Sequence, residues 1–282
     1  MSTTVPPPFD FEELFGVNAG FVEQVYAEFM ARPDSVSDEW QRFFERHLPA
    51  EHLPERPAEP VATTKDASGG AADSTEVPAG AKPLSGIAAK IAQNMAESLT
   101  VPTATSARDV PVRVLEENRK IVNEHLIGEV RGKASFTHFI AWAMVRAMID
   151  VQGMQARYVV YGEKAHREVS DSINVGIAVD VSKPGGPRQL LVPNIKDCAS
   201  MNFATFLAAY DAQVRKARKG KLTPQDFQGT TCSLTNPGTI GTLSSLPRLM
   251  TGQSFILATG AIAYPAAYIR SKINRHICVS LA

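Results

Sequence analysis

The chain has 282 residues, enough for one substantial hydrophobic core of roughly 150 to 250 residues and a smaller additional segment. Its 29 basic and 29 acidic residues balance, so the net charge favours neither nucleic acid nor an anionic membrane as a partner. The three cysteines, Cys198, Cys232 and Cys278, are far apart and odd in number, which suits neither a disulfide framework nor a paired-cysteine zinc site. We therefore expect a reduced, cytoplasmic protein without a metal site.

The beginning of the chain, MSTTVPPPFDFEELFG, has neither the basic nor the apolar region of an export signal. No segment supplies the roughly 18 consecutive apolar residues that a membrane-spanning helix needs. The sequence thus predicts a protein that is neither exported nor inserted into a membrane.

A short helical arm is predicted over residues 1–47, with its helices between Phe11 and His47. Apolar residues recur there at helical spacing: Phe21, Val25, Phe29, Trp40, Phe43 and Phe44. Pro33 and Asp34 end the first helix, and Ser37 is positioned to cap the second. A unit this small buries little apolar surface. Two interpretations stay open, a helical extension packed on its own domain and a docking arm for a partner subunit.

Residues 48–82 are predicted to form a flexible linker. The stretch LPAEHLPERPAEPVATTKDASGGAADSTEVPAGAK is rich in Pro, Ala, Glu, Gly and Ser and contains no aromatic residue. Such a composition buries too little apolar surface to offset the entropy of ordering the chain. A linker of this length implies that the segments on either side need independent positions.

Residues 83–282 are predicted to form the main domain, a mixed α/β or α+β layered fold. Three helices are expected from apolar spacing. The first contains Ile87, Ile91, Met95 and Leu99. The second, predicted to be buried, contains Phe136, Phe139, Ile140, Ala143, Met144, Ala147 and Met148. The third runs near Phe203, Phe206, Leu207, Tyr210 and Val214, and basic residues precede Gly220 at its end, as the helix dipole favours. The expected strands are RYVVYG, INVGIAVDV, QLLVPNI, TTCSLTN and SFILATGAI.

Common catalytic and cofactor motifs are absent from the sequence. We find no GxxxxGK[ST], GxGxxG, HExxH or GxSxG pattern. His138 lies beside an apolar helix, His166 lies in a charged loop, and His47 and His52 border the linker; none has a partner at metal or triad spacing. The residues alone therefore indicate a mixed domain with one unusual segment, TCSLTNPGTIGT, in which Thr235 and Asn236 follow a strand and precede a tight turn.

Two parts of the sequence resemble known protein families, and the second part includes this segment. The stretch FGVNAGFVEQVYAEFMARPDSVSDEWQRFFE is similar to the N-terminal arm of 2-oxoglutarate dehydrogenases. The stretches INVGIAVDVSKPGGPRQLLVPNIKDC and TCSLTNPGTIGTLSSLPRLMTGQSFILATGAI resemble the catalytic domain of 2-oxoacid dehydrogenase acyltransferases, which have a chloramphenicol acetyltransferase-like fold. Together they resemble the fused 2-oxoglutarate dehydrogenase/succinyltransferase of some bacteria, over about residues 11–265.

The resemblance implies an acyltransferase of the tricarboxylic acid cycle that moves succinyl between dihydrolipoamide and coenzyme A, its two substrates. It implies that the Thr235 hydroxyl stabilises the oxyanion formed when a thiolate attacks an acyl thioester, and that Asn236 holds the turn. It further implies a homotrimer with a channel between subunits, and other subunits of the 2-oxoacid dehydrogenase complex as partners. Thiamine diphosphate and Mg²⁺ would belong to a decarboxylase part that these residues do not include.

The sequence departs from the family after about residue 265. The family's base is a histidine in a His-x-x-x-Asp-Gly motif, whereas His276 is followed by ICVSLA. Two interpretations therefore stay open, an acyltransferase domain and a catalytically inactive fragment that acts at most as an assembly or docking module. The missing motif favours the second and predicts little or no succinyltransferase activity.

Overall fold

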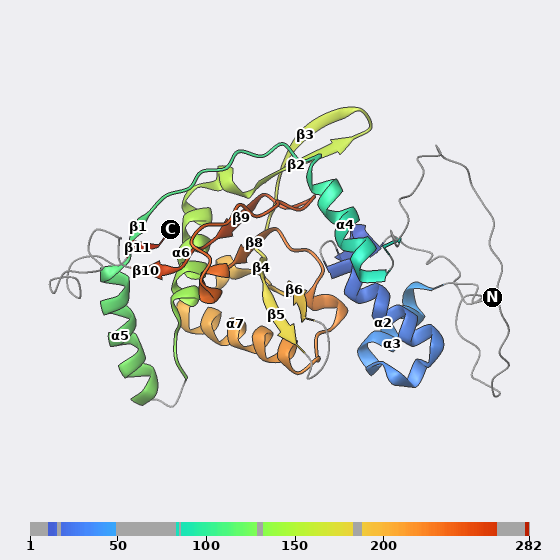
Figure 1. Cartoon of the computed structure of the whole chain (residues 1–282), viewed down its shortest axis with the longest axis horizontal. Helices are drawn as coiled ribbons and strands as arrows, with labels where there is room; N and C mark the ends of the chain where they lie inside the picture. The colour runs from blue at the N-terminus through green and yellow to red at the C-terminus, as the bar shows by residue number, and fades with distance from the viewer. Residues whose placement is uncertain are drawn as a thin grey trace. The chain divides into compact units, whose positions relative to one another are not determined.

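A computed structural model describes residues 11–15, 18–48, 83–84, 86–128, 132–182, 188–263 and 280–281 of the chain (Figure 1). The chain divides into two compact units, residues 1–93 and residues 94–282. Within the described residues no helix is both long and apolar enough to cross a membrane. The predicted linker lies outside the described residues apart from Leu48, and so does His276.

The smaller unit contains the predicted arm, as three α-helices. They are α1 (Phe11–Phe15), α2 (Ala19–Ala31) and α3 (Asp38–His47), with a 3₁₀ turn, η2 (Pro33–Ser35), between the last two. Ser37 occupies the N-cap of α3 as predicted, although its hydroxyl makes no cap hydrogen bond to the helix backbone. The Pro-Asp pair thus ends α2, since proline lacks the N–H that would continue the helix.

Aromatic rings form the core of the arm. Phe44 is fully buried, and its ring centroid lies 5.4 Å from that of Tyr26, 5.2 Å from that of Phe29 and 5.6 Å from that of Trp40. Ring pairs at these separations stabilise a fold beyond the area that they bury. The helical spacing of aromatic residues in the sequence therefore corresponds to one packed cluster.

After the arm, the described residues form four α-helices: α4 (Gly86–Ser98), α5 (Arg113–Gly128), α6 (Phe136–Asp150) and α7 (Phe203–Arg218). Sequence reasoning identified all but α5. The predicted end of α7 is confirmed, because its last turn carries Arg215, Lys216 and Arg218 and the chain then reverses at Gly220, whose φ is 62°. Three short 3₁₀ turns, η4 (Gln152–Gln155), η5 (Cys198–Ser200) and η6 (Pro224–Asp226), complete this set.

The buried face of α6 differs from the predicted stripe. Ala143 and Ala147 are exposed, whereas His138, Ala141 and Val145 are buried. The helix is apolar around most of its circumference, so hydrophobic spacing alone cannot determine which side meets the rest of the domain. The prediction of a buried helix holds, and so does the burial of Met144 and Met148, but the predicted burial of Ala143 and Ala147 is wrong.

The strands of the larger unit form four small sheets. Their bounds are β1 (Val110–Pro111), β2 (Ala156–Tyr161), β3 (Lys164–Val169), β4 (Val175–Ile177), β5 (Val179–Ser182), β6 (Arg188–Leu191), β7 (Asn194–Ile195), β8 (Cys232–Thr235), β9 (Phe255–Ala258), β10 (Ile262–Ala263) and β11 (Ser280–Leu281). The four-stranded sheet has the order β7-β4-β8-β9, and the others are β1-β11-β10, β2-β3 and β5-β6. Three predicted strands are each split in two, at Ala178, at Val192–Pro193 and at 259–261.

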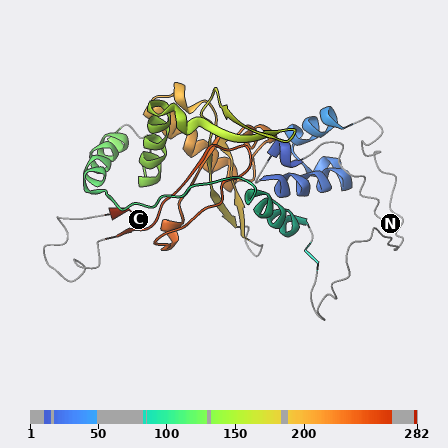
Figure 2. The same ribbon diagram turned by 90° about the horizontal axis from the view of Figure 1, so that it is seen from above.

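The four-stranded sheet has two chemically different faces. β4, β8 and β9 run parallel, with Gly176 opposite Ser233 and Ile177 opposite Leu234. Because side chains alternate along a strand, Cys232 and Leu234 share one face while Ser233 and Thr235 share the other. Figure 2 shows α6 and α7 on one side of these strands. The apolar face is the one that helices bury, so Thr235 lies on the opposite face.

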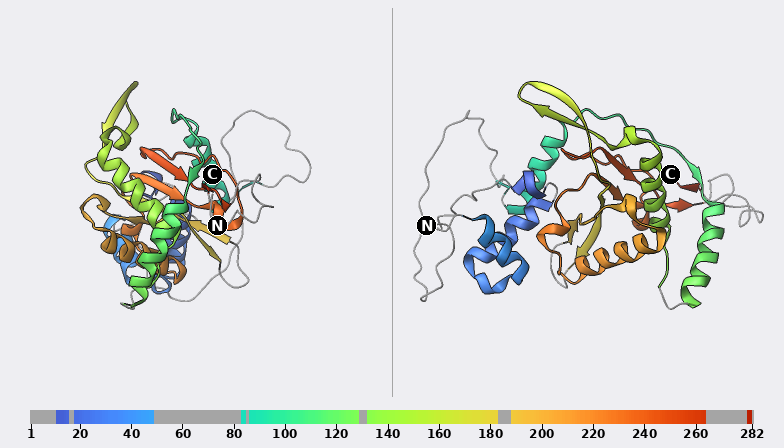
Figure 3. Two further views of the ribbon diagram at one scale, coloured as in Figure 1. Left: turned by 90° about the vertical axis from the view of Figure 1, so that its left-hand side faces the viewer. Right: turned by 180° about the vertical axis from the view of Figure 1, so that it is seen from behind.

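The β2–β3 hairpin extends away from the four-stranded sheet, as Figure 3 shows. Its tight turn follows Tyr161, and His166 lies on β3 opposite Val159 rather than in a loop as predicted. Arg157 joins the hairpin to the chain before β9, since its guanidinium contacts Glu168 at 2.7 Å and the carbonyl of Gly252 at 3.4 Å. The hairpin is thereby held to the edge that leads into β9.

Asp226, in η6, anchors the end of α7. Its carboxylate accepts hydrogen bonds from the side chains of Gln213 and Lys216, both at 2.9 Å, and from the backbone N–H and hydroxyl of Thr223 at 2.8 and 2.9 Å. Burial raises the pKa of Asp226, but these hydrogen bonds outweigh burial and hold the pKa below its usual value. The buried carboxylate is therefore a stabilising anion at neutral pH.

Replacing Asp226 by asparagine is expected to lower the free energy of unfolding by about 1–3 kcal/mol at pH 7, because charge-assisted bonds are lost. The pKa of Asp226 is lower in the folded than in the unfolded protein, where it is about 3.9. The stabilisation by Asp226 is therefore complete above the unfolded-state pKa and is lost as the pH falls through the folded-state pKa. Thermal unfolding of both proteins from pH 7 down to pH 3 measures the difference. A difference that does not shrink with acid would contradict the assignment.

Candidate active site at the end of strand β8

The segment that was unusual in the sequence forms a tight turn at the carboxyl end of β8. Thr235 ends the strand opposite Ala258 of β9. The turn continues as the 3₁₀ segment η7 (Pro237–Ile240), in which the N–H of Gly241 donates to the carbonyl of Gly238 at 3.0 Å. Polar groups at the carboxyl end of a parallel strand are well placed to meet a ligand, because ligands in open α/β sheets bind beyond these ends.

Backbone hydrogen bonds fix the turn to the chain that follows β9. The N–H of Thr259 donates to the carbonyl of Thr235 at 3.0 Å, and the N–H of Gly238 donates to the carbonyl of Thr259 at 3.2 Å. A Cβ atom on Gly238 would lie 2.1 Å from the carbonyl oxygen of Gly260, so only glycine allows this approach. The backbone on both sides of Thr235 is therefore held in place.

The hydroxyl of Thr235 is available to a ligand. The side chain is half-buried, and its hydroxyl forms no hydrogen bond with another residue of the described chain. By contrast, the Ser233 hydroxyl on the same face is buried and donates to Oε1 of Gln253 at 2.7 Å. Within the described part of the chain, the Ser233 hydroxyl is thus used by the fold, and the Thr235 hydroxyl remains a donor without a partner.

Asn236 is turned toward α6. Its Nδ2 donates to the Thr137 hydroxyl oxygen at 2.7 Å, and its carbonyl accepts from the Thr239 hydroxyl at 3.1 Å. The side chain therefore does not compete for the ligand position beside Thr235. Thr137 was not identified from the sequence, because it precedes Asn236 by 99 positions and carries no motif.

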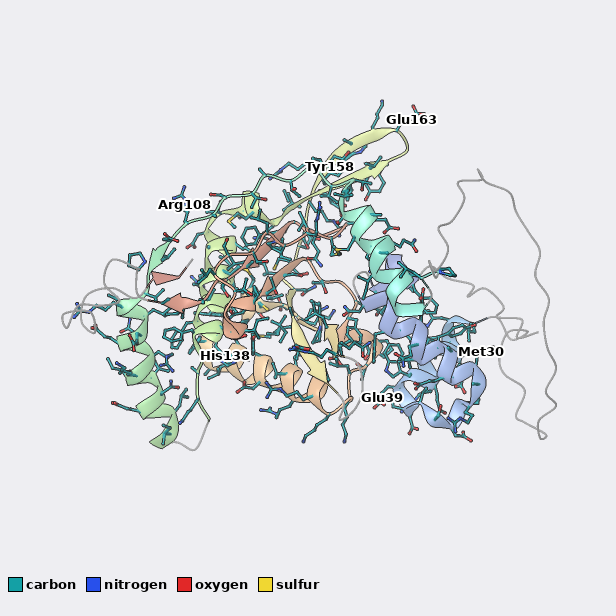
Figure 4. All side chains as sticks on the ribbon, viewed as in Figure 1. Met30, Glu39, Arg108, His138, Tyr158 and Glu163 are labelled. Atoms are coloured by element: carbon teal, nitrogen blue, oxygen red, sulfur yellow. The ribbon has the colours of Figure 1, made fainter. Side chains whose placement is uncertain are left out.

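His138, on α6, is buried and forms a pair with the partly exposed Asp211 of α7; Figure 4 labels His138 at the lower end of α6. Its Nδ1 accepts from the N–H of Ser135 at 2.9 Å, so the ring proton lies on Nε2, 3.2 Å from Oδ1 of Asp211, without good hydrogen-bond alignment. Burial lowers the pKa of His138, and Asp211 opposes this only in part. The absence of a partner inferred from spacing is thus wrong for His138. The unprotonated nitrogen, Nδ1, already accepts the hydrogen bond from Ser135, however, so this histidine cannot serve as the base.

The two described cysteines are not nucleophiles. Cys198 and Cys232 are both buried and free of disulfides. Burial raises the pKa of Cys198 to about 11 and that of Cys232 to about 12, so both thiols stay protonated at neutral pH. In the described part of the chain, no three His, Cys, Asp or Glu side chains are grouped as a metal site would require.

Sequence profiles of two families match the chain. The catalytic domain of 2-oxoacid dehydrogenases acyltransferase matches residues 78–282, and the 2-oxoglutarate dehydrogenase N-terminus matches residues 13–47. The 2-oxoglutarate dehydrogenase E1/E2 component of Corynebacterium glutamicum is 41% identical over 90% of this chain and 23% of its own length. The chain thus spans about a quarter of the length of that relative.

Two solved structures share the fold. A probable dihydrolipoamide acetyltransferase from Listeria monocytogenes superposes with a TM-score of 0.57 at 24% identity, over 72% of this chain and 84% of its own. A truncated catalytic core of the 2-oxoacid dehydrogenase multienzyme complex from Thermoplasma acidophilum superposes with a TM-score of 0.53 at 24% identity, over 66% and 81%. The predicted mixed α/β fold of the chloramphenicol acetyltransferase-like class is confirmed.

Proposed function

Because the chain belongs to the 2-oxoacid dehydrogenase acyltransferase family, we propose that its larger unit moves a succinyl group between dihydrolipoamide and coenzyme A. The family acts on lipoyl and coenzyme A thioesters. Our proposal adds that the acyl group transferred is succinyl. The observation that carries it is the hydroxyl of the half-buried Thr235, which has no hydrogen-bond partner among the described residues at the carboxyl end of β8.

The proposed reaction is a thioester exchange. A thiol loses its proton to a base, and its sulfur attacks the carbonyl carbon of the succinyl thioester, which places a negative charge on the carbonyl oxygen. The Thr235 hydroxyl donates a hydrogen bond to that oxyanion. The carbon–sulfur bond to the departing thiol then breaks, and that sulfur takes up a proton. Succinyl is thereby transferred without any net oxidation.

The base is not supplied by a described histidine near Thr235. His138 is buried and its unprotonated Nδ1 accepts from the N–H of Ser135, and His166 lies on the projecting hairpin. Within this chain the proposal leaves His276, outside the described residues, as the candidate. A second copy facing the same channel is the other source of a base.

We further propose that the larger unit works as a homotrimer within a 2-oxoacid dehydrogenase complex. Support comes from Ile240, Leu243 and Leu246, three large apolar side chains that are exposed in and after the active-site turn. A neighbouring copy would cover them and close the channel beside Thr235. In this proposal residues 1–47 and the linker 48–82 connect residues 83–282 to other subunits. The free thiols of Cys198 and Cys232 support a reducing cytoplasm as the compartment.

The purified chain, given succinyl coenzyme A and dihydrolipoamide, is expected to accelerate thioester exchange over the uncatalysed rate, but far less than a family member with the His-x-x-x-Asp-Gly motif, as the sequence predicts. A general base contributes about 10² to 10⁴ in rate, so His276→Ala should remove that factor if His276 is the base. The rate of succinyl-dihydrolipoamide formation measures both. A folded chain that does not accelerate the exchange would instead establish the noncatalytic assembly module.

A further inference from the structure

We propose that Thr137, in the first turn of α6, is a positioning residue for the active-site turn. Its hydroxyl oxygen receives the hydrogen bond from Asn236 at 2.7 Å, and Asn236 directly follows the oxyanion donor Thr235 in the chain. The consequence for catalysis rests on the proposed function. The positioning itself is a property of the fold and can be measured separately.

The hydrogen bond between Asn236 and Thr137 connects the active-site turn to α6, whereas the other hydrogen bonds of the turn connect it elsewhere. The backbone bonds of the turn run to Thr259 and within 237–242, which all belong to the segment around β9 or to the turn itself. Asn236 has φ −126° and ψ 77°, outside the helical and extended values, so its conformation is not imposed by a regular element. The Thr137 contact is the described side-chain hydrogen bond that connects Asn236 to α6.

The N-terminus of α6 is a rigid anchor for that contact. Ser135 and His138 form a reciprocal capping box, in which the backbone N–H of Ser135 donates to Nδ1 of His138 at 2.9 Å. The His138 ring is buried, packs against the ring of Tyr210 at a centroid distance of 4.3 Å and faces Asp211 of α7. The residues on both sides of Thr137 are thus held by the core rather than by the loop.

A fixed Asn236 determines where the Thr235 hydroxyl points. The carbonyl of Thr235 is held by the N–H of Thr259, and the side chain of the next residue, Asn236, is held by Thr137. A rotation of Asn236 therefore changes the backbone torsion of Thr235 that lies between these two contacts. The Thr235 side chain then moves relative to the reacting carbonyl. Misplacement of a catalytic group by about 1 Å costs on the order of 10² in rate.

The test compares Thr137→Val, which removes the hydroxyl at nearly constant volume, with Thr137→Ser, which keeps it. Thr205→Val is the matched control, because Thr205 lies in the first turn of α7 and its hydroxyl contacts only its own N-cap residue, Asn202, at 3.0 Å. Hydrogen–deuterium exchange over residues 235–242 reports the turn directly. Steady-state kinetics of succinyl exchange report its consequence.

We expect Thr137→Val to increase exchange over 235–242 about five- to tenfold, the effect of one lost hydrogen bond, and to leave exchange elsewhere in the sheet unchanged. It should lower kcat by about ten- to a hundredfold at constant KM. Thr137→Ser and Thr205→Val should resemble the unaltered chain in both measurements. Rescue by serine separates the hydroxyl from a general packing effect.

Unchanged exchange over 235–242 in Thr137→Val would overturn the positioning role, whatever the kinetics. Faster exchange with unchanged kcat would show that the turn is tied by Thr137 but that Thr235 does not depend on it, which also overturns the proposal. If the unaltered chain lacks activity, the proposed function fails, and the exchange measurement still decides whether Thr137 holds the turn.

Discussion

Replacing Thr235 by alanine is expected to lower the kcat of succinyl exchange by about 10² to 10³ while KM changes little. The hydroxyl has no partner among the described residues, so its removal leaves no buried group unsatisfied and should not affect folding. Its hydrogen bond becomes strong only when negative charge develops on the carbonyl oxygen. Initial rates at varied succinyl coenzyme A and dihydrolipoamide concentrations measure this effect.

Thr235→Ser is the matched control, since it retains the hydroxyl on the same strand end and should keep most of the turnover. Thermal unfolding of all three proteins tests whether the fold is intact. An alanine variant with unchanged kcat and a raised KM would show that Thr235 binds the ground state of the substrate and does not stabilise the oxyanion. Burial of the hydroxyl away from any channel in the proposed trimer would also contradict the oxyanion role.

Local chemistry allowed much of the fold to be predicted. The basic end of α7 before Gly220 and the aromatic spacing of α2 and α3 each depend on residues close together in the chain, and both are present in the structure. The predicted strands lie at the correct positions in the chain, but three of them were predicted to be longer than the strands of the structure. INVGIAVDV was expected to be one strand, yet the N–H of Ala178 donates to Leu234 of β8, and the chain then leaves this sheet to pair as β5 with β6.

The parts of the site that were missed are all contacts between distant segments. Thr137 meets Asn236, and Asp211 meets His138, because α6 lies beside both the turn that follows β8 and α7; neither pair has a local signature. The role of Thr235 came from family resemblance, since a threonine at a strand end is a common structural residue. The structure adds that this residue is half-buried and that its hydroxyl has no partner among the residues described, a property that no sequence pattern encodes.

The structure also explains why residue 238, in the turn after β8, is a glycine. The backbone of Gly238 passes so close to Gly260 that a Cβ would lie 2.1 Å from its carbonyl oxygen and 2.5 Å from the nitrogen of Ala261. These are backbone atoms that cannot rotate away. The two chain segments that hold Thr235 are therefore in direct contact only because this residue has no side chain.

Gly238→Ala is accordingly expected to lower kcat by an amount at the lower end of the range expected for loss of the Thr235 hydroxyl. Normal contact between carbon and a backbone oxygen needs a separation of about 3.3 Å or more, so the turn must move away from Gly260 by roughly 1 Å. That movement breaks the bond from the N–H of Gly238 to Thr259 and displaces Thr235, which costs on the order of 10² in kcat. Overpacking of this kind also lowers the free energy of unfolding by about 1–3 kcal/mol.

The matched control is Gly153→Ala, because a Cβ on Gly153, in η4, meets no atom within 4 Å and its φ is not in the left-handed region. That variant should keep both turnover and stability. Kinetics and thermal unfolding of the two variants, measured side by side, separate contact at the turn from the general effect of adding a methyl group. If Gly238→Ala lost stability but kept its kcat, the turn would be shown to hold the fold without aiming Thr235, and the catalytic role assigned to this strand end would have to be abandoned.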